Sequence, residues 1–202
     1  MPKLSYSFYQ HDVVTELAVQ LLGKQLFTRV DGELTGGTIV ETEAYNGVTD
    51  KASHAYGGRL TNRTKVMYEQ GGLSYVYLCY GIHHLFNVVS GAQGTPQAVL
   101  IRGIEPITGI DVMLRRRNKS VLQPNLSAGP GALAKALGID MKLNAKDLLG
   151  DEIWIEDNGI YYKAEQLVAG PRIGVAYADD HALLPWRYYV KGNKYVSKPH
   201  IK

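Results

Sequence analysis

The sequence predicts an α+β fold, with a curved, mostly antiparallel β-sheet, packed helices and a protruding β-hairpin. Short stretches rich in β-branched and aromatic residues recur along the 202 residues, and Gly- and Asn-containing turns separate them. Apolar residues fall at helical spacing in only a few places. No Ser/Pro-rich linker or block of like charge divides the chain, so we expect residues 1–202 to form a single domain.

Composition narrows the class of protein. Apolar residues make up 45% of the chain and charged residues 20%, which is enough to bury a core. The net charge of +3 permits a nucleic-acid partner without requiring one. Cys79 is the only cysteine and suits a reducing compartment. Without a signal-peptide core or an apolar run near the roughly 20 residues of a membrane span, we expect a cytoplasmic protein without membrane contact.

The first elements follow from periodicity and turn chemistry. Apolar residues across 13–22 are spaced as in a helix, with Asp12 as the expected N-cap and Gly23 just after its end. Residues 26–30 then alternate as in a strand and lead to Asp31-Gly32. This dipeptide is typical of a hairpin turn, so we expect the next strand to pair with this one.

Residues 38–44 form the stretch on which a catalytic interpretation depends. Ile39, Val40 and Thr42 favour a strand. On a strand, residues two apart share a face, so Glu41, Glu43 and Tyr45 are expected to point the same way. A carboxylate near aromatic rings can act as an acid or base, but a solvated edge strand would show the same pattern.

The segment 46–71 is rich in turn residues and is expected to be a binding loop. It contains His54, Arg59, Arg63 and Lys65. The three cations could contact phosphates, or could simply be solvated on the loop.

A second hairpin is predicted from residues 73–79 and 84–90. Tyr80 and Ile82 fall near its tip, where exposed apolar groups are costly unless they contact a partner. Some DNA-binding proteins insert such side chains between base steps. The alternative is that Tyr80 folds back onto the sheet.

Residues 98–104 are expected to form a strand in which Arg102 interrupts an apolar row and therefore needs a carboxylate or an ordered water as partner. A helix over 108–118 should follow. Another helix is expected to begin at the Gly-rich segment 127–131. The free N–H groups at its start could contact a phosphate, or the segment could simply cap the helix. The remaining strands are predicted at 153–156, 172–177 and 186–190.

Common cofactor and hydrolase motifs are missing from the sequence. It has no Walker loop, no G-x-G-x-x-G after a strand and no G-x-S-x-G. His83 and His84 are adjacent and would point apart on a strand, which is poor metal-ligand geometry. We therefore expect no cofactor and no metal.

Taken together, these segments resemble the alkyladenine (3-methyladenine, or methylpurine) DNA glycosylase family. The resemblance runs in order through nearly the whole chain, from about residue 12 to residue 197. Its blocks are Ile39–Tyr45, His54 with Gly57–Arg59, Tyr75–Tyr77 with Tyr80-Gly81, Asn87, Leu100–Arg102, Ser127–Pro130 and Arg172–Val175.

The resemblance implies a monofunctional glycosylase of base excision repair acting on damaged purines such as 3-methyladenine, 7-methylguanine, hypoxanthine and ethenoadenine. Glu43 matches the family's general base, and Arg102 the residue that holds the nucleophilic water with it. The positions that match the base-binding pocket are Tyr45, His54, Tyr77 and Asn87.

Tyr80 matches the side chain that fills the gap in the duplex, with Ile82 beside it where mammalian members carry Met. The expected partner is double-stranded DNA, contacted through its backbone by Arg59, Arg63, Lys65 and Arg172. We expect a monomer, associated with the nucleoid if the source is bacterial.

Two other hypotheses fit parts of the sequence. A non-catalytic binder of damaged or single-stranded nucleic acid would account for the 14 tyrosines and the cations, but not for Glu43 and Arg102 placed to meet. A hydrolase acting on sugars could use Glu41 and Glu43, which lie about 7 Å apart by strand rise. Release of free base from lesion-bearing DNA separates these possibilities.

Overall fold

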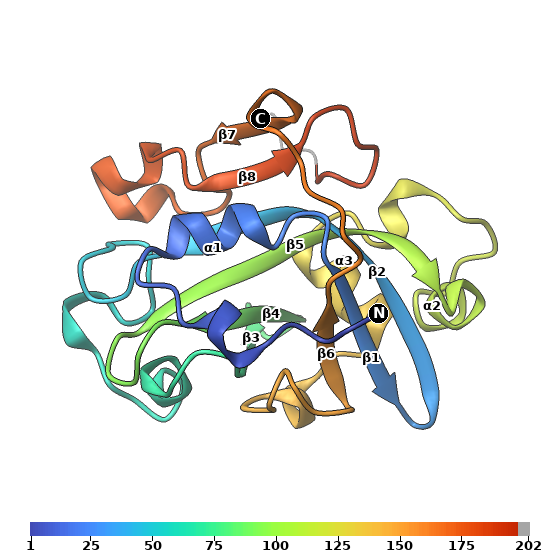
Figure 1. Cartoon of the computed structure of the whole chain (residues 1–202), viewed down its shortest axis with the longest axis horizontal. Helices are drawn as coiled ribbons and strands as arrows, with labels where there is room; N and C mark the ends of the chain where they lie inside the picture. Colours follow the sequence, from blue (N-terminus) through green and yellow to red (C-terminus); the bar gives the residue numbers. More distant parts are fainter. Residues whose placement is uncertain (198–202) are drawn as a thin grey trace.

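A computed structural model describes residues 1–197 of the chain. Within this part, an antiparallel eight-stranded sheet is accompanied by three α-helices and several 3-10 turns (Figure 1). The strands are β1 (Gln25–Val30), β2 (Glu33–Tyr45), β3 (Ser74–Cys79), β4 (His83–Ser90), β5 (Gln97–Thr108), β6 (Ile153–Glu156), β7 (Leu167–Gly170) and β8 (Arg187–Val190). The α-helices are α1 (Val14–Gln20), α2 (Ile110–Arg116) and α3 (Pro130–Leu137). The prediction of an α+β fold is confirmed.

Strand β2 holds the sheet together because it pairs with three other strands. The strand order is β3-β4-β5-β2-β1-β6, and β8 pairs with both β2 and β7. One edge of β2 pairs with β5 along most of its length. The other edge pairs first with β1, through Glu33–Thr38, and then with β8, through Glu41–Glu43. Glu41 and Glu43 therefore lie between β5 and β8.

The β2–β5 ladder is irregular at this point. Ile39 pairs with Ile104, Glu41 with Gly103, and Thr42 with Ile101. Val40 is thus an extra residue on β2, and Arg102 is an extra residue on β5. Such bulges change the direction of a side chain relative to a regular ladder and are frequent beside active sites. The carbonyl of Arg102 is used outside the ladder, where it accepts from the N–H of Gly129 at 2.9 Å.

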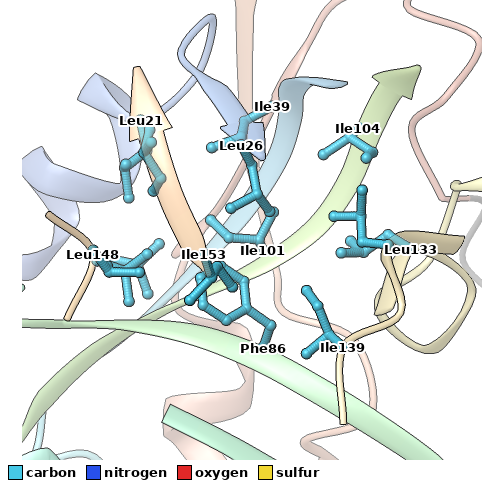
Figure 2. Close-up of a cluster of buried hydrophobic side chains, with 14 of the residues drawn as sticks. Leu21, Leu26, Ile39, Phe86, Ile101, Ile104, Leu133, Ile139, Leu148 and Ile153 are labelled. Atoms are coloured by element: carbon cyan, nitrogen blue, oxygen red, sulfur yellow. The ribbon is translucent and has the colours of Figure 1, made fainter. Parts of the chain in front are cut away.

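The main core lies between the sheet and the helices packed on it, chiefly α1 and α3. Figure 2 shows aliphatic side chains from β1, β2, β5, β6 and the helices meeting around Phe86 of β4. Phe86, Ile101 and Ile153 are fully buried. Each such side chain contributes about 1.5–3 kcal/mol through removal from water, so the core gives β2 and β5 a rigid base.

Both predicted hairpins are present. Asp31 and Gly32 connect β1 to β2, and β3 pairs with β4 from Ser74↔Val88 to Cys79↔His83. The helix near the N-terminus also forms, but its N-cap is Val13 and no side chain caps it, so the prediction of an Asp12 cap was wrong.

The prediction of a strand at 172–177 was wrong as well. This segment follows β7 and enters a 3-10 stretch, Ala176–Leu183, with Gly174 at φ +78°. Its backbone does not join a ladder because the N–H of Ile173 donates to a side-chain carboxylate. Among the described residues, no helix has the length and apolar character needed to cross a membrane.

Candidate active site

A cavity of about 510 Å³ opens beside β3, β4 and β5, between the loop after β2 and the segment after β7. This volume lies within the roughly 300–1,000 Å³ range of small-molecule sites. Most of its lining is aromatic or apolar, with a few polar groups. The side chains used below are Tyr45, His54, Arg63, Tyr75, Tyr77, Asn87, Arg102 and Tyr177.

An aromatic wall bounds the cavity on the β3 side. Tyr75 and Tyr77 are two apart on β3 and share a face, as the strand period requires. His54, from the loop after β2, meets Tyr77 edge-to-face with ring centroids 4.7 Å apart. Its Nδ1 lies 2.7 Å from the hydroxyl of Tyr75. A flat base placed in this cavity can therefore contact several rings at once.

The imidazole of His54 is neutral near pH 7. Burial lowers the pKa of His54 to about 4, and the charges of Arg63 and Arg59 act in the same direction. The hydrogen bond with Tyr75 fixes the ring through Nδ1. A neutral, fixed imidazole can hydrogen-bond a ligand without adding positive charge to the cavity.

Glu43 and Arg102 meet at the side of the cavity formed by Tyr45, in the pairing that the resemblance implied. Arg102 Nη1 lies 3.3 Å from Glu43 Oε1, and the Glu43 side chain is fully buried. The N–H of Ile173 donates to the same oxygen at 2.7 Å, and the hydroxyl of Tyr45 donates to Oε2 at 2.8 Å. Because a carboxylate oxygen has two lone pairs, Oε2 keeps one acceptor site beyond the bond from Tyr45.

Tyr45 separates Glu43 from the open part of the cavity. Tyr45, Arg102 and Ile173 line the cavity, whereas Glu43 lies behind them. Burial raises the pKa of Tyr45 well above its usual value, and the neighbouring Glu43 adds to the effect. The phenol therefore stays protonated and remains a donor to the carboxylate.

The second acidic residue, Glu41, has a different environment. It is fully buried and accepts from Arg102 Nε at 3.1 Å and Arg187 Nε at 2.7 Å. The N–H and hydroxyl of Ser197 also donate to it, at 2.7 and 2.8 Å. With four donors around it, Glu41 has no room to act on a sugar, so the geometry does not favour the hypothesis of a paired-carboxylate hydrolase acting on sugars.

Asn87 is buried on β4 and lines the cavity. Its Nδ2 donates to the carbonyl of Tyr75 at 3.0 Å, which fixes the amide relative to the aromatic wall. The amide therefore presents a rigid polar group at the place where the resemblance implied a base-binding residue.

The tip of the β3–β4 hairpin is the most exposed apolar feature near the cavity. Tyr80 is 89% exposed and Ile82 is 72% exposed. Tyr80 does not fold back onto the sheet, and its φ of +50° lies in the left-handed region. Gly81 beside it has φ +70°, and positive φ at both central residues is typical of a tight hairpin turn.

The four cations predicted to contact the DNA backbone fall in different environments. Arg59 and Lys65 are exposed on the loop. Arg63 is exposed as well, but its guanidinium carbon lies 4.6 Å from the Tyr77 ring centroid, at the cavity wall. Arg172 corrects the prediction: its side chain is fully buried and forms two hydrogen bonds to Asp50, at 2.5 and 2.8 Å, so it does not present a charge to DNA.

Arg172 instead supports the site from behind. Besides the pair with Asp50, it donates to the carbonyl of Ala44 at 2.9 Å. Its guanidinium also lies 4.8 Å from the ring of Tyr45 and 5.1 Å from that of Trp186. The buried charge fixes the loop after β2 and the ring that covers Glu43.

The Gly-rich start of α3 forms hydrogen bonds to strand β5. The N–H of Gly129 donates to Arg102, and the hydroxyl of Ser127 donates to the carbonyl of Ile104 at 2.6 Å. The segment therefore ties α3 to the bulge that carries Arg102. Within residues 1–197, no group of three His, Cys, Asp or Glu side chains is placed to hold a metal ion.

Sequence reasoning missed three contributors to this site. Arg187 and Ser197 lie far from Glu41 in the chain, and nothing in their local sequence marks them. The bulge at Arg102 had one available signal, Gly103, because a glycine inside a strand often marks a bulge or a close approach. A Cβ at this glycine would lie 2.6 Å from the carbonyl oxygen of Tyr195.

The fold and this cavity place a buried acid–guanidinium pair beside an aromatic-lined cavity of small-molecule size, an arrangement typical of an enzyme active site. Comparison with known proteins then identifies the family. The family model described as methylpurine-DNA glycosylase matches residues 7–194, and the chain belongs to this family. It is accordingly a hydrolase of N-glycosyl bonds that acts in DNA repair.

Relatives of similar length support the assignment. One from Bacillus cereus (strain G9842) is 47% identical over 201 residues, covering 95% of this chain and 97% of the relative. One from Bacillus thuringiensis (strain Al Hakam) is 46% identical over 200 residues, with the same coverage. One from Clostridium acetobutylicum is 44% identical over 202 residues, covering 96% and 97%. All three are named as candidate 3-methyladenine DNA glycosylases.

Proposed function

We propose that this enzyme rotates a damaged purine nucleotide out of duplex DNA and hydrolyses its N-glycosidic bond with a water molecule activated by Glu43. The observation that carries the proposal is the pairing of a fully buried Glu43 with Arg102 directly behind a cavity lined by aromatic rings. A base inside a duplex cannot be reached by such a pair, so the nucleotide must leave the stack, at a cost of a few kcal/mol.

The cavity favours planar and cationic leaving groups. Purines alkylated at N3 or N7 carry a positive charge, which electron-rich rings such as Tyr77 attract. The substrates that follow are 3-methyladenine and 7-methylguanine, with hypoxanthine and ethenoadenine as neutral members that must gain a proton from solvent. The neutral imidazole of His54 adds no opposing charge to the cavity.

The chemical step requires the carboxylate of Glu43, the guanidinium group of Arg102 and one water molecule. The bond from C1′ to the purine nitrogen breaks and its electron pair leaves with the base, so that the sugar gains oxocarbenium character. The water oxygen forms the new bond to C1′ and its proton passes to Glu43. The carboxylate also stabilises the positive sugar, while Arg102 orients the water. The product is an abasic site.

The proposal also specifies a monofunctional enzyme. Among the described residues, no lysine lines the cavity. A Schiff base between protein and sugar, which strand cleavage by a bifunctional glycosylase requires, therefore has no amine in place to form it.

Release of free base by the variant Glu43→Gln tests the central role. Glutamine keeps the shape and can still accept from Ile173, and Arg102 retains Glu41, so we expect the variant to fold. Loss of the general base should lower the single-turnover rate by about 10²–10⁴-fold, while binding to lesion-bearing duplex changes little.

Glu105→Gln provides the matched control, because Glu105 lies on the same strand as Arg102 and is bonded to Asn193 at 2.9 Å, away from the cavity. It should release base at the wild-type rate. A near-normal rate for Glu43→Gln would refute the proposed mechanism, and tight binding of damaged duplex without release by the wild-type enzyme would favour a non-catalytic binder.

A further inference from the structure

The second buried carboxylate, Glu41, is not consumed by the proposed reaction, yet it contacts the catalytic guanidinium directly. Glu41 and Glu43 are both fully buried, and Arg102 bridges them through two different nitrogens. Arg187 of β8 is the other cation of the cluster, and its Nε lies 2.7 Å from Glu41. The cluster therefore contains two carboxylates and two guanidinium groups.

The geometry of Arg102 makes the contact with Glu41 directional. A guanidinium group is planar and rigid, so fixing one nitrogen sets the direction of the others. Glu41 holds Nε at 3.1 Å, and this places Nη1 at 3.3 Å from Glu43, on the side that lines the cavity. Because Arg102 sits in a bulge, the strand ladder does not fix its side chain by itself.

Charge balance gives Glu41 a second effect. Removing Glu41 would leave Glu43 as the remaining carboxylate of the pair that Arg102 contacts. A buried charge that loses its partner is strongly unfavourable, so Arg102 would turn towards Glu43 and away from the cavity.

The segment after β8 completes the environment of Glu41. Ser197 donates both its N–H and its hydroxyl to the carboxylate, and its carbonyl accepts from Arg187 Nη2 at 3.0 Å. Gly103 allows this segment to approach, since any side chain there would meet the carbonyl of Tyr195. A residue 156 positions beyond Glu41 thus supplies two of its four donors.

From these contacts we infer that Glu41 is a positioning residue for the reaction, fixing Arg102 relative to Glu43, and that the segment at Ser197 is part of the same support. This inference rests on the proposed function, because it assigns Glu41 a role through Arg102 and not a contact with the substrate. A merely structural cluster would hold β2, β5 and β8 together, so removing Glu41 would lower the amount of folded enzyme and reduce base release and DNA binding alike.

The variant Glu41→Gln tests the inference by comparing the single-turnover rate of base release with the affinity for lesion-bearing duplex. We expect the rate to fall by about 10–100-fold, from loss of orientation. Affinity should stay at the wild-type value, because Glu41 does not line the cavity.

Ser197→Pro and Ser197→Ala examine the support without changing a charge. Proline removes both donors to Glu41 and should lower the rate by about tenfold, whereas alanine removes only the hydroxyl and should have a smaller effect. Lys191→Ala is the control, because Lys191 is exposed in the same part of the chain. If Glu41→Gln fails to fold, the two Ser197 variants still test the inference.

The outcomes separate the two proposals. A rate of base release in Glu41→Gln that falls only in proportion to the binding of lesion-bearing duplex would overturn the positioning role and leave a structural one. Wild-type rates in both Glu41→Gln and Ser197→Pro, alongside an inactive Glu43→Gln, would overturn this inference alone. Near-normal release by Glu43→Gln would instead overturn the proposed function on which it rests.

Discussion

Truncation of Tyr80 at the tip of the β3–β4 hairpin should affect DNA binding and folding stability differently. We expect Tyr80→Ala to weaken binding to duplex containing an abasic site, because the ring would no longer fill the gap that the rotated nucleotide leaves. Folding should hardly change, since the side chain is 89% exposed. Substitutions at such surface positions usually alter stability by less than about 0.5 kcal/mol.

The size of the binding effect follows from stacking. A base stacked on an aromatic side chain is worth about 1–3 kcal/mol by alanine substitution, which corresponds to a loss of affinity of about 5- to 150-fold. Tyr80→Gly should change stability and DNA binding in opposite directions. Glycine relieves the left-handed conformation at φ +50°, so it should raise stability by up to about 1 kcal/mol while weakening binding as alanine does.

Fluorescence anisotropy with a labelled duplex carrying a stable abasic analogue measures the first effect, at one fixed salt concentration. Urea unfolding measures the second. Val121→Ala is the control, because Val121 is 61% exposed and does not line the cavity. Unchanged affinity for the abasic duplex in Tyr80→Ala would show that the exposed ring has no role in the gap.

The remaining predictions concern charge, the buried acid pair and the reaction type. Arg59→Gln and Lys65→Gln should each weaken binding to all duplexes and reduce the slope of log affinity against log salt by about 0.9, measured by anisotropy titration; an unchanged slope would exclude a phosphate contact. Asp50→Asn should lower stability to urea by about 3–5 kcal/mol at pH 7, because Arg172 loses its buried partner. Although burial favours the protonated form, the hydrogen bonds and charge of Arg172 outweigh it and hold the pKa of Asp50 below its usual value. The contribution of Asp50 to the free energy of unfolding is therefore present above its unfolded pKa of about 3.9 and is lost as the pH falls through the folded-state pKa. The difference in stability between wild type and Asp50→Asn should thus disappear in acid. A difference that stays constant with pH would contradict the role of the ion pair. Tyr45→Phe should lower the single-turnover rate of base release, because the carboxylate of Glu43 loses the hydrogen bond that orients it; an unchanged rate would contradict this. Borohydride should trap no protein–DNA adduct during turnover, and a trapped band on a denaturing gel would overturn the monofunctional assignment.

The sequence by itself determined most of the strands and the types of residue on them, although it missed β7 and predicted a strand at 172–177 that does not form. Period-two alternation and turn dipeptides predicted both hairpins, and the exposed pair Tyr80 and Ile82 was placed at a tip from sequence alone. Arg102 was recognised as a cation that needs a carboxylate or an ordered water because it interrupts an apolar row. These inferences succeed because burial period and turn chemistry are local properties of the chain.

Only the tertiary structure showed that Arg102 contacts both acids and that their environments differ. Glu41 and Glu43 look equivalent in the sequence, since both alternate on one strand. The bulge at Arg102, the pairing of β8 with β2 and the approach of Ser197 give Glu41 four donors, and they leave Glu43 an acceptor site behind Tyr45. Arg172 shows the same limit, because its burial against Asp50 depends on two segments that are 122 residues apart. Contacts between distant segments depend on how the sheet and its connections pack, and local sequence patterns carry no record of that packing.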